Sequence, residues 1–296
     1  MFQVASHPAA FPHHHPAARR GGFEPAAPAP VTLPRTLARP PFTDVSRDAL
    51  AAADPALAPV PAEFVRHGLR AKAPQMLAGI AALAPSHVPQ SLPRSHLPAA
   101  LTVPLRASPA GAPPPSYPTH VLAIAPAPAK GAPQDRDAPH AIFPVHAVVL
   151  AAHCAKLPRL PPAQPAPPAR AASATLPLLP LALPSPQAFA ILHSFLYTHR
   201  LSSALGSLLP LPPAFLEGLT HAAVRAALES GSARHALAAH LCAAAAGNLG
   251  TLMGHAGHVK ELWQDMVALG VYDSELWDAL DLAWEIVLGA LNLAAQ

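Results

Sequence analysis

Apolar residues recur at helical spacing in the C-terminal part of the chain. In residues 185–201, Phe189 and Leu196 help to make one apolar face. Ser185 can cap the N-terminus of this helix, and Pro186 suits its first turn. The same periodicity continues through further helical segments, which we place at residues 212–228, 233–246, 249–269 and 273–293. The pattern therefore predicts a mostly helical C-terminal region.

The last of these segments divides most clearly into two faces. At about 100° per residue, one face collects large apolar side chains, among them Trp277 and Trp284. We expect this face to be buried, because each indole can bury about 150–250 Å². The opposite face is an acidic stripe, formed by Glu275, Asp278, Asp281 and Glu285. The stripe is either a solvated face or a docking surface for a basic partner, and we take Asp278, Asp281 and Glu285 as candidate partner contacts.

Apolar runs with β character precede these helices. They lie at residues 120–124, 141–145 and 175–183. The first two are predicted to form a hairpin with a long loop, after which the chain enters a helix at 147–156 that Pro158 stops. The third run contains Pro177 and Pro180, so if it is a strand we expect an edge strand, because proline cannot donate to a central ladder. The predicted fold class is α+β, mostly helical.

Proline divides the chain into two regions of different character. Of the 41 prolines, 37 precede Ser185 and none follows Pro213. Residues 1–59 are rich in proline, alanine and histidine, and we predict that they are disordered. Residues 85–117 are again broken by proline and are predicted to be a linker.

Residues 60–84, between these two stretches, carry apolar residues at helical spacing. Pro74 is expected to split them into two helices, at about 61–73 and 75–84. Isolated helices of this length are marginal in water, so we expect the pair to dock on the core or on a partner.

Charge also differs between the two regions. Residues 1–140 hold 12 Lys/Arg and 7 Asp/Glu, whereas residues 141–296 hold 7 and 9. The basic residues Arg66, Arg70 and Lys72 of the segment 60–84 are candidate contacts for an acidic partner. The other cations are dispersed rather than clustered, which weakens the case for nucleic-acid binding. Direct DNA binding by the basic N-terminal half is therefore the alternative function and not the preferred one.

The sequence contains no motif that predicts catalysis. A nucleotide-binding glycine loop, a nucleophile elbow and an HExxH pattern are all missing. His255 and His258 share a helical face, but only Cys242 lies near enough in sequence to join them, and a zinc site needs three or four ligands. Glu261 and Asp265 are read as a surface pair. We therefore predict a protein without catalytic residues, metal or cofactor.

The two cysteines and the apolar runs indicate the cellular compartment of the protein. Cys154 and Cys242 lie in apolar helical segments and are read as buried free thiols of a reducing compartment. The N-terminus lacks an apolar core of signal-peptide length, and no apolar run has the character of a membrane span. We expect a nuclear or cytoplasmic protein that is not secreted.

Two stretches resemble the BTB/POZ interaction domain. Residues 143–152 read FPVHAVVLAA, against the family's F-P-x-H-x-x-V-L-A-A. Against the family's S-P-x-x-F-x-x-L-L-x-F-L-Y-T, the residues that match in order and spacing are Ser185-Pro186, Phe189, Leu192 and Phe195-Leu196-Tyr197-Thr198. The resemblance covers about 118–245 and implies a BTB/POZ-like core. His199 replaces the usual glycine after Tyr-Thr, and the acidic start of the first strand is missing. These departures leave the dimer of that family, and the oligomeric state, open.

A wider resemblance is to the fungal clampless family, regulators of clamp-cell formation and dikaryon development in basidiomycetes. It covers about 60–295 and is carried by segments at residues 61–80, 146–162, 183–200 and 258–291. The last segment, HVKELWQDMVALGVYDSELWDALDLAWEIVLGAL, is long and contains all three tryptophans. The resemblance implies a non-enzymatic regulator that acts through protein partners, with mating-type-controlled transcription factors as the expected class. It supplies no catalytic residues.

The resulting domain prediction has a central BTB-like region and a C-terminal helical pair. The BTB-like region takes residues 118–245, and the helical pair takes residues 246–296 and packs on it. The segment 60–84 is expected to dock on the same core.

Overall fold

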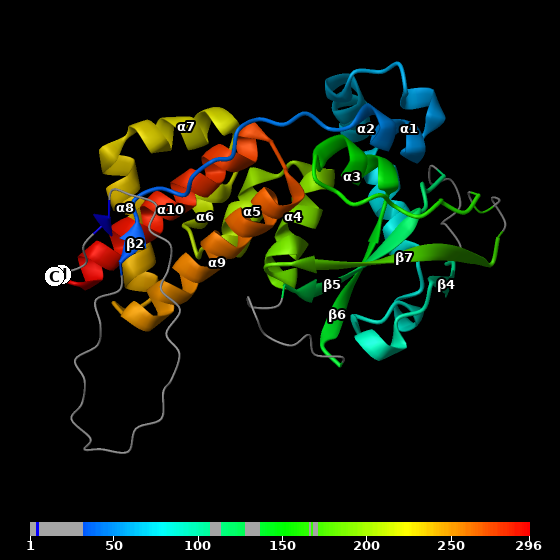
Figure 1. The fold of residues 1–296 in the computed structure, drawn as a ribbon. Coiled ribbons are helices and arrows are strands. Elements are labelled where there is room, and N and C mark those ends of the chain that lie inside the picture. The colour runs from blue at the N-terminus through cyan, green and yellow to red at the C-terminus, as the bar shows by residue number, and fades with distance from the viewer. Residues whose placement is uncertain (1–3, 6–31, 107–113, 128–136, 166, 168–170) are drawn as a thin grey trace.

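The structure is a computed structural model that describes residues 4–5, 32–106, 114–127, 137–165, 167 and 171–296. Figure 1 shows a β-sheet at one end and a group of long helices at the other, with helix α4 (Pro186–Thr198) between them. The predicted class, α+β and mostly helical, is confirmed.

Within the described residues, five strands form one mixed sheet in the order β3-β6-β5-β7-β4. Their bounds are Ser91–Pro93 (β3), Ala100–Pro104 (β4), His120–Pro126 (β5), Pro139–Val145 (β6) and Ser173–Leu183 (β7). β5 and β6 pair antiparallel, as the predicted hairpin requires, and β5 pairs parallel with β7. β5 is buried from His120 to Ala125, as expected for a central strand covered on both faces.

β7 lies inside the sheet, so the prediction of an edge strand is wrong. Its first half, through Pro177, pairs with β4, and its second half, from Leu178, pairs with β5. Each half therefore has one paired neighbour, and neither Pro177 nor Pro180 has to donate to strands on both sides. The strand tolerates its prolines because it changes neighbour along its length.

β3 and β4 lie in the segment 85–117, so the prediction of a linker is wrong for its described part. Thr102 Oγ1 of β4 lies 3.0 Å from Thr175 Oγ1 of β7, and Val103 is fully buried. Both strands are short and end at proline, so the local pattern carries little strand signal. Pairing with distant strands stabilises them. Residues 107–113 lie outside the described part of the chain.

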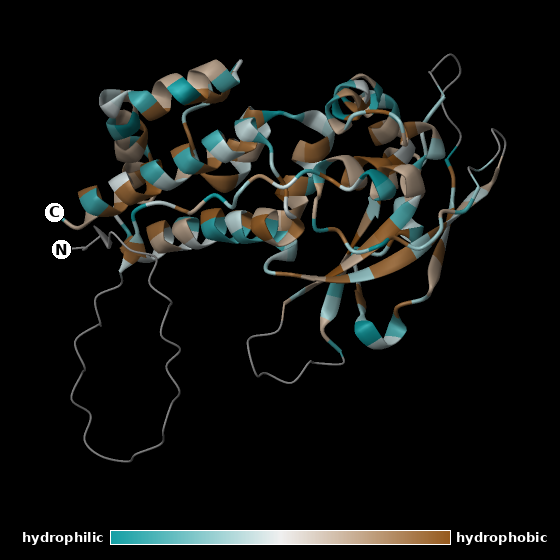
Figure 2. Ribbon diagram, turned by 45° about the horizontal axis from the view of Figure 1, so that its top comes forward, coloured by the Kyte–Doolittle hydropathy of each residue, from teal (hydrophilic) through white to brown (hydrophobic). Residues whose placement is uncertain are grey.

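Two clusters of buried side chains lie on opposite faces of the sheet. Leu122 and Ile124 of β5 enter the larger cluster, which the helices complete. Val121 and Ala123 enter a smaller cluster on the side of β4. In Figure 2 the central strands are largely hydrophobic in colour, whereas the outer helices alternate. The larger cluster continues without a break into the C-terminal helices.

Most of the helices that follow the hairpin pack around α10. Their bounds are Ala147–His153 (α3), Leu201–Leu208 (α5), Pro213–Leu216 (α6), His221–Glu229 (α7), Gly231–Ala244 (α8), Leu249–Leu269 (α9) and Ser274–Ala294 (α10). α10 contacts α5, α7, α8 and α9, and α4 packs on α9. Trp277 and Trp284 are both at most 2% exposed, so the prediction of a buried tryptophan face is confirmed.

Helix ends follow the predicted capping residues in most places. Ser185 Oγ accepts from Ala188 N at 3.2 Å, and Asp273 Oδ1 accepts from Leu276 N at 3.0 Å. The predicted single helix at 212–228 is wrong. Gly218 has a φ of +67° and separates α6 from α7, because that conformation ends a helix.

Helix α2 (Ala62–Ala81) is continuous, so the predicted split at Pro74 is wrong. Pro74 lies on the exposed side of the helix, while Leu69 and Met76 are buried before and after it. Packing of this face outweighs the one backbone hydrogen bond that proline removes. α2 packs against α3 and α4, which agrees with the expected docking on the core.

The described residues between 32 and 59 are ordered, so the prediction of disorder for 1–59 is wrong there. They contain helix α1 (Arg47–Ala53), and Leu50 is 1% exposed. The short strand β2 (Leu33–Pro34) pairs in parallel with β1 (Val4–Ala5). Residues 1–3 and 6–31 lie outside the described part of the chain.

Candidate functional site

The acidic stripe of α10 is engaged by other parts of the same chain. Arg39 donates to Asp278 Oδ1 at 2.6 Å and also forms an ion pair with Asp281. His221 Nε2 lies 2.7 Å from Asp278 Oδ2. Burial alone would raise the pKa of Asp278, but hydrogen bonds with Arg39 and His221 outweigh it, and the pKa lies below its usual value. Burial keeps the pKa of Asp281 above its usual value.

The remaining carboxylates of α10 are also paired within the chain. Arg234 of α8 lies 3.4 Å from Glu285, and Arg70 of α2 lies 3.8 Å from Glu275. The solvated-face interpretation of the stripe is therefore wrong. An outside partner reaches these acids only where it replaces an internal one.

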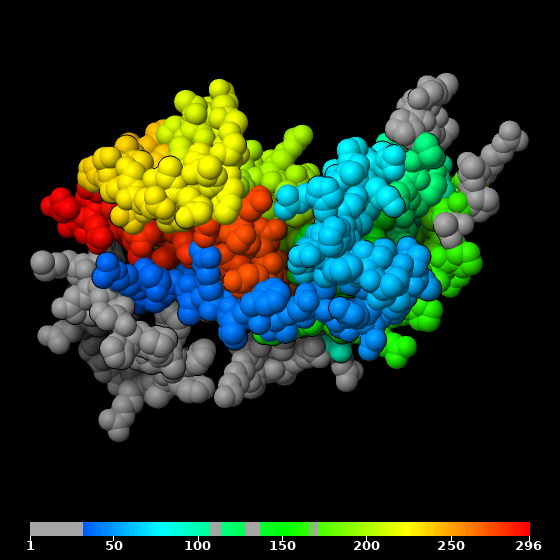
Figure 3. Space-filling view, turned by 90° about the horizontal axis from the view of Figure 1, so that it is seen from above, coloured from blue at the N-terminus to red at the C-terminus, as the bar shows by residue number. Residues whose placement is uncertain are grey.

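Arg39 belongs to a non-helical segment, residues 32–45, which we call the strap. Figures 1 and 3 show it running from the C-terminal helices to α1, and in Figure 3 it is the blue band beside them. Trp284 Nε1 donates to the carbonyl of Pro34 at 3.1 Å, and Trp263 Nε1 donates to that of Ala38 at 2.8 Å. Leu37 is 5% exposed. The strap thus covers the two helices that carry the tryptophans and the stripe.

The candidate basic residues of α2 do not share one surface. Arg66 Nε donates to the carbonyl of Ala152 at the end of α3 at 2.6 Å. Arg70 faces α10 and also lies 3.4 Å from His199 Nδ1. Lys72 is exposed and lines a groove on another side of the helix. Two of the three predicted contacts therefore hold the chain's own parts together.

A polar seam joins the two halves of the molecule next to Arg70. His199 caps α4 in the left-handed conformation, with a φ of +47°, and its Nδ1 lies 3.7 Å from Asp273 Oδ2. Burial, together with the nearby Arg70, lowers the pKa of His199 to about 4. His153 lies beside it, with ring centroids 5.5 Å apart, and its Nε2 is buried without a hydrogen-bond partner. Both rings are neutral at neutral pH, so His199 and Asp273 do not form a charge pair there.

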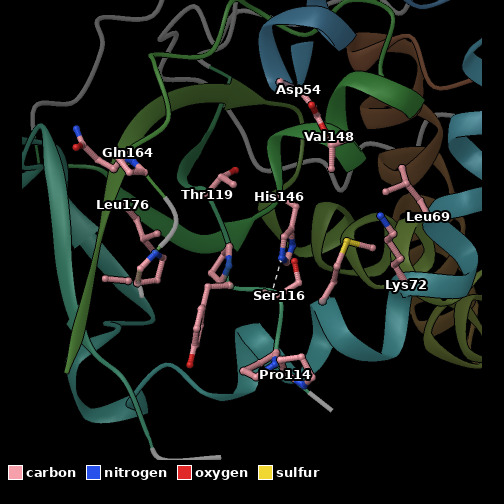
Figure 4. A pocket seen from close by; sticks show the side chains of 18 of the residues that line it. Asp54, Leu69, Lys72, Pro114, Ser116, Thr119, His146, Val148, Gln164 and Leu176 are labelled. Atoms are coloured by element: carbon pink, nitrogen blue, oxygen red, sulfur yellow. Dashed lines mark hydrogen bonds between the residues drawn. The ribbon is translucent and has the colours of Figure 1, made fainter. Parts of the chain in front are cut away.

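A large hollow in the described structure is a groove beside α2, with a volume of about 1380 Å³. Figure 4 shows Leu69 and Lys72 on the side of α2, and Pro114 and Ser116 on the segment that faces it. The start of β7 and the end of η1 (Pro55–Leu57) complete the walls. Phe64 lies at the groove and is 65% exposed, although it is a large apolar side chain.

Three charged side chains line this groove, namely Asp54, Lys72 and Arg106. Asp54 caps η1, where its Oδ1 accepts from Ala56 N at 3.0 Å. Within the described chain, no carboxylate lies within ion-pair distance of Lys72 or Arg106. The groove therefore combines apolar walls with two available cations.

His146 is the histidine of this groove, and both of its ring nitrogens are occupied. Nε2 lies 3.0 Å from the carbonyl of Ser116, which can only accept, so Nε2 carries the proton. Nδ1 then accepts from the Tyr197 hydroxyl at 2.9 Å. Burial lowers the pKa of His146. The ring joins the segment before β5 to α4, which is a structural role.

Asp265 is fully buried, so the prediction of a surface pair is wrong for it, whereas Glu261 is half-buried. Its Oδ1 accepts from the Ser185 backbone N–H at 3.0 Å, and the Ser185 hydroxyl donates to Glu261 Oε2 at 2.9 Å. Burial, reinforced by Glu261, raises the pKa of Asp265 to about 7. The pair ties the start of α4 to α9.

Arg39 and Phe64 shape the surface but were not predicted to do so from the sequence. No local pattern could identify Arg39, because its carboxylate partners lie 239 and 242 residues further along the chain. Phe64 did carry a signal. The buried positions of α2, Val65, Leu69, Ala73 and Met76, follow the i, i+4 and i+3 spacing of one face, and Phe64 falls off it.

The described residues hold no group of three or more His, Cys, Asp or Glu side chains arranged to bind a metal ion. Both cysteines are free. Cys154 is buried, as predicted, whereas Cys242 is only half-buried. Among the helices described, none is both long and apolar enough to cross a membrane.

Comparison with known protein families gives two matches. Residues 40–184 match the model of the Clampless protein 1 N-terminal domain, and residues 202–296 match that of the Clampless protein 1 C-terminal domain. No curated protein and no solved structure gives a significant match, and neither family match is to a BTB/POZ domain. Residues 185–201, which include α4, separate the two matched ranges, whereas the predicted domain boundary lies near residue 245. The chain belongs to the clampless protein family.

Proposed function

We propose that the chain acts in clamp development as a non-enzymatic interaction protein that binds a partner protein in the groove beside α2. Its two clampless domains indicate the role in clamp development. The observation that carries the mode of action is the groove itself, where an exposed Phe64 and the available cations Lys72 and Arg106 surround a large open hollow.

The size and chemistry of the groove favour a polypeptide ligand. Small-molecule pockets usually have volumes of about 300–1000 Å³, and the groove, at about 1380 Å³, is larger. Exposed aromatic side chains are frequent anchors in protein interfaces. Lys72 and Arg106 add a preference for carboxylates. The partner segment is therefore apolar and acidic.

The alternative of DNA binding through the basic N-terminal half receives less support. Arg39 and Arg70 pair with carboxylates of α10, and Arg66 lies 3.8 Å from Asp44. Cations that are neutralised in this way contribute little to phosphate binding.

Two finer parts of the proposal rest on the family resemblances. Mating-type-controlled transcription factors are the proposed partner class, in the nucleus or the cytoplasm. The order β5, β6, α3, β7, α4, with the two motifs in β6–α3 and in α4, supports a BTB/POZ-like arrangement of the central region.

Complementation of a basidiomycete strain that lacks the chain tests the groove. The double variant Phe64→Glu, Lys72→Glu removes the aromatic anchor and reverses one cation. We expect loss of clamp cells, together with loss of the partner that the wild-type chain captures. Both side chains are exposed, so the melting temperature should change by no more than a few degrees.

Glu63→Lys is the matched control, because it reverses an exposed charge of the same helix that does not line the groove. It should restore clamp cells as fully as wild type. Normal clamp formation with the double variant would show that the groove is not the partner site.

A further inference from the structure

The strap is held in the manner of a bound peptide ligand. Its backbone bends at residues 35–36 and forms no helix, and two of its carbonyls, those of Pro34 and Ala38, accept from tryptophan indoles of α10 and α9. Leu37, between these carbonyls, is almost fully buried. Arg39 then reaches across to Asp278 and Asp281. These contacts fix the position of the strap along the two helices. They consist of hydrogen bonds to its backbone, one buried apolar side chain and one ion-paired side chain.

The surface beneath the strap belongs to the C-terminal clampless domain. The family model for residues 202–296 includes Trp263, Trp284, Asp278 and Asp281. The N-terminal model begins at residue 40, so Pro34 to Arg39 precede both matched domains. The family domain therefore supplies a complete receiving surface, and a segment outside either domain fills it.

We infer that this surface is a second partner-binding site, which takes a non-helical segment of a partner protein with a buried leucine two residues before an arginine, and that the strap masks it in cis. The inference rests on the proposed function only in taking the partner to be a protein. The site is distinct from the groove beside α2, whose lining includes none of these residues.

Charge and backbone chemistry select this class of occupant. Asp278 and Asp281 present two carboxylates to a planar guanidinium, and Arg39 donates to Asp281 through Nε as well as through its terminal nitrogen. Indole N–H groups only donate, so they require acceptors such as the carbonyls of a non-helical segment. A partner segment with this pattern replaces each strap contact one for one.

A fluorescent peptide of residues 32–45 tests the inference on the full chain. The receiving proteins are wild type and a loosened variant, Leu37→Asp with Arg39→Glu, which weakens the strap in cis. We expect saturable binding of the peptide to the loosened variant, at least tenfold tighter than to wild type, because the cis strap competes at high effective concentration.

Two charge changes provide the controls. A peptide with Arg39→Glu should bind the loosened variant at least tenfold more weakly than the wild-type peptide does. Adding Asp278→Arg and Asp281→Arg to the loosened variant should reverse that preference. If the loosened variant does not keep its circular dichroism spectrum, Arg39→Gln in the full chain removes only the ion pairs and takes its place.

The outcomes against the inference are distinct. Folded variant protein that does not bind the peptide would show that the surface is not a binding site. Equal binding to wild type would show that the strap does not mask it. A dimer of the loosened variant in light scattering would make a second copy's strap the occupant instead. None of these results bears on clamp formation through the groove.

Discussion

At the scale of single residues, the most unusual side chain of the described chain is the buried carboxyl of Asp265. Oδ1 accepts from the Ser185 N–H, whereas Oδ2 is buried without a partner. A buried carboxylate that lacks a partner is costly, so the folded state favours the protonated form. The pKa is accordingly raised from 3.8 to about 7.

This shift predicts that the chain loses stability as the pH rises. Below the ordinary pKa of 3.8, Asp265 is protonated in both states, and between 3.8 and about 7 only the folded state keeps the proton. Stability therefore falls across this window, by roughly 1–3 kcal/mol. Asp265→Asn keeps the Oδ1 acceptor without the charge. It should flatten the dependence and raise the melting temperature at pH 8.

The control for this prediction is Asp48→Asn, at an exposed carboxylate in the first turn of α1. Melting curves at pH 5, 6, 7 and 8 measure the slope for all three proteins. A slope in Asp265→Asn equal to that of wild type would show that Asp265 does not titrate in this range.

At the scale of elements, the segment that packs against α2 determines which residues the helix can carry. Its Gly79 meets the backbone of the segment that forms the far wall of the groove, and an added Cβ would lie 1.6 Å from the carbonyl oxygen of Ser116. The same segment is bonded to the helix by Ser116 N and Gln75 O at 3.0 Å. A glycine that costs stability in an isolated helix is therefore required here by close approach.

Two glycine-to-alanine changes in this one helix should have opposite effects. Gly79→Ala should destabilise the chain by about 2–3 kcal/mol or more, because Ser116 must move. Since the Ser116 carbonyl also accepts from His146, the groove wall should be displaced as well. Gly68→Ala meets nothing within 4 Å and should stabilise the chain by about 0.5–1 kcal/mol.

Urea denaturation measures both changes. Both variants gain the same helix propensity from glycine to alanine. The difference between their free energies of unfolding therefore measures the cost of the close approach at Gly79. Equal effects of Gly79→Ala and Gly68→Ala would show that the segment 114–119 does not pack on α2 as described.

At the scale of the whole molecule, the two clampless domains share one core. The larger cluster of buried residues runs from Leu50 of α1 to Leu291 of α10. The backbone also crosses the boundary, where Cys154 after α3 pairs with Val271 between α9 and α10. The domains should therefore unfold together.

Cys154 provides the measurement, because it is 4% exposed and burial raises its pKa to about 12. In a Cys242→Ala variant it is the only thiol of the chain. We expect its labelling by a thiol reagent to follow the same urea midpoint as the circular dichroism signal. Labelling at lower urea would show that the domains separate before they unfold.

The amphipathic pattern and the capping residues were sufficient to predict much of the fold. The hairpin, the Ser185 and Asp273 caps and the buried faces of α4 and α10 depend on local spacing, which is written in the sequence. The clampless family was identified from the same motifs. Pro74 and the short strands β3 and β4 misled because local propensity opposed contacts that proved stronger.

The sequence by itself determined which segments form helices and which faces they bury, because side-chain spacing sets both. Only the tertiary structure decided which surfaces remain for binding. Asp278 and Asp281 were candidate contacts for an outside partner, but Arg39 pairs with both of them, and Phe64, which lies off the buried face of α2, lines a groove that only the folded chain forms. Periodicity reports only on residues that are close in sequence, so it cannot predict contacts between residues 239 or more positions apart. Such contacts form only when the chain folds.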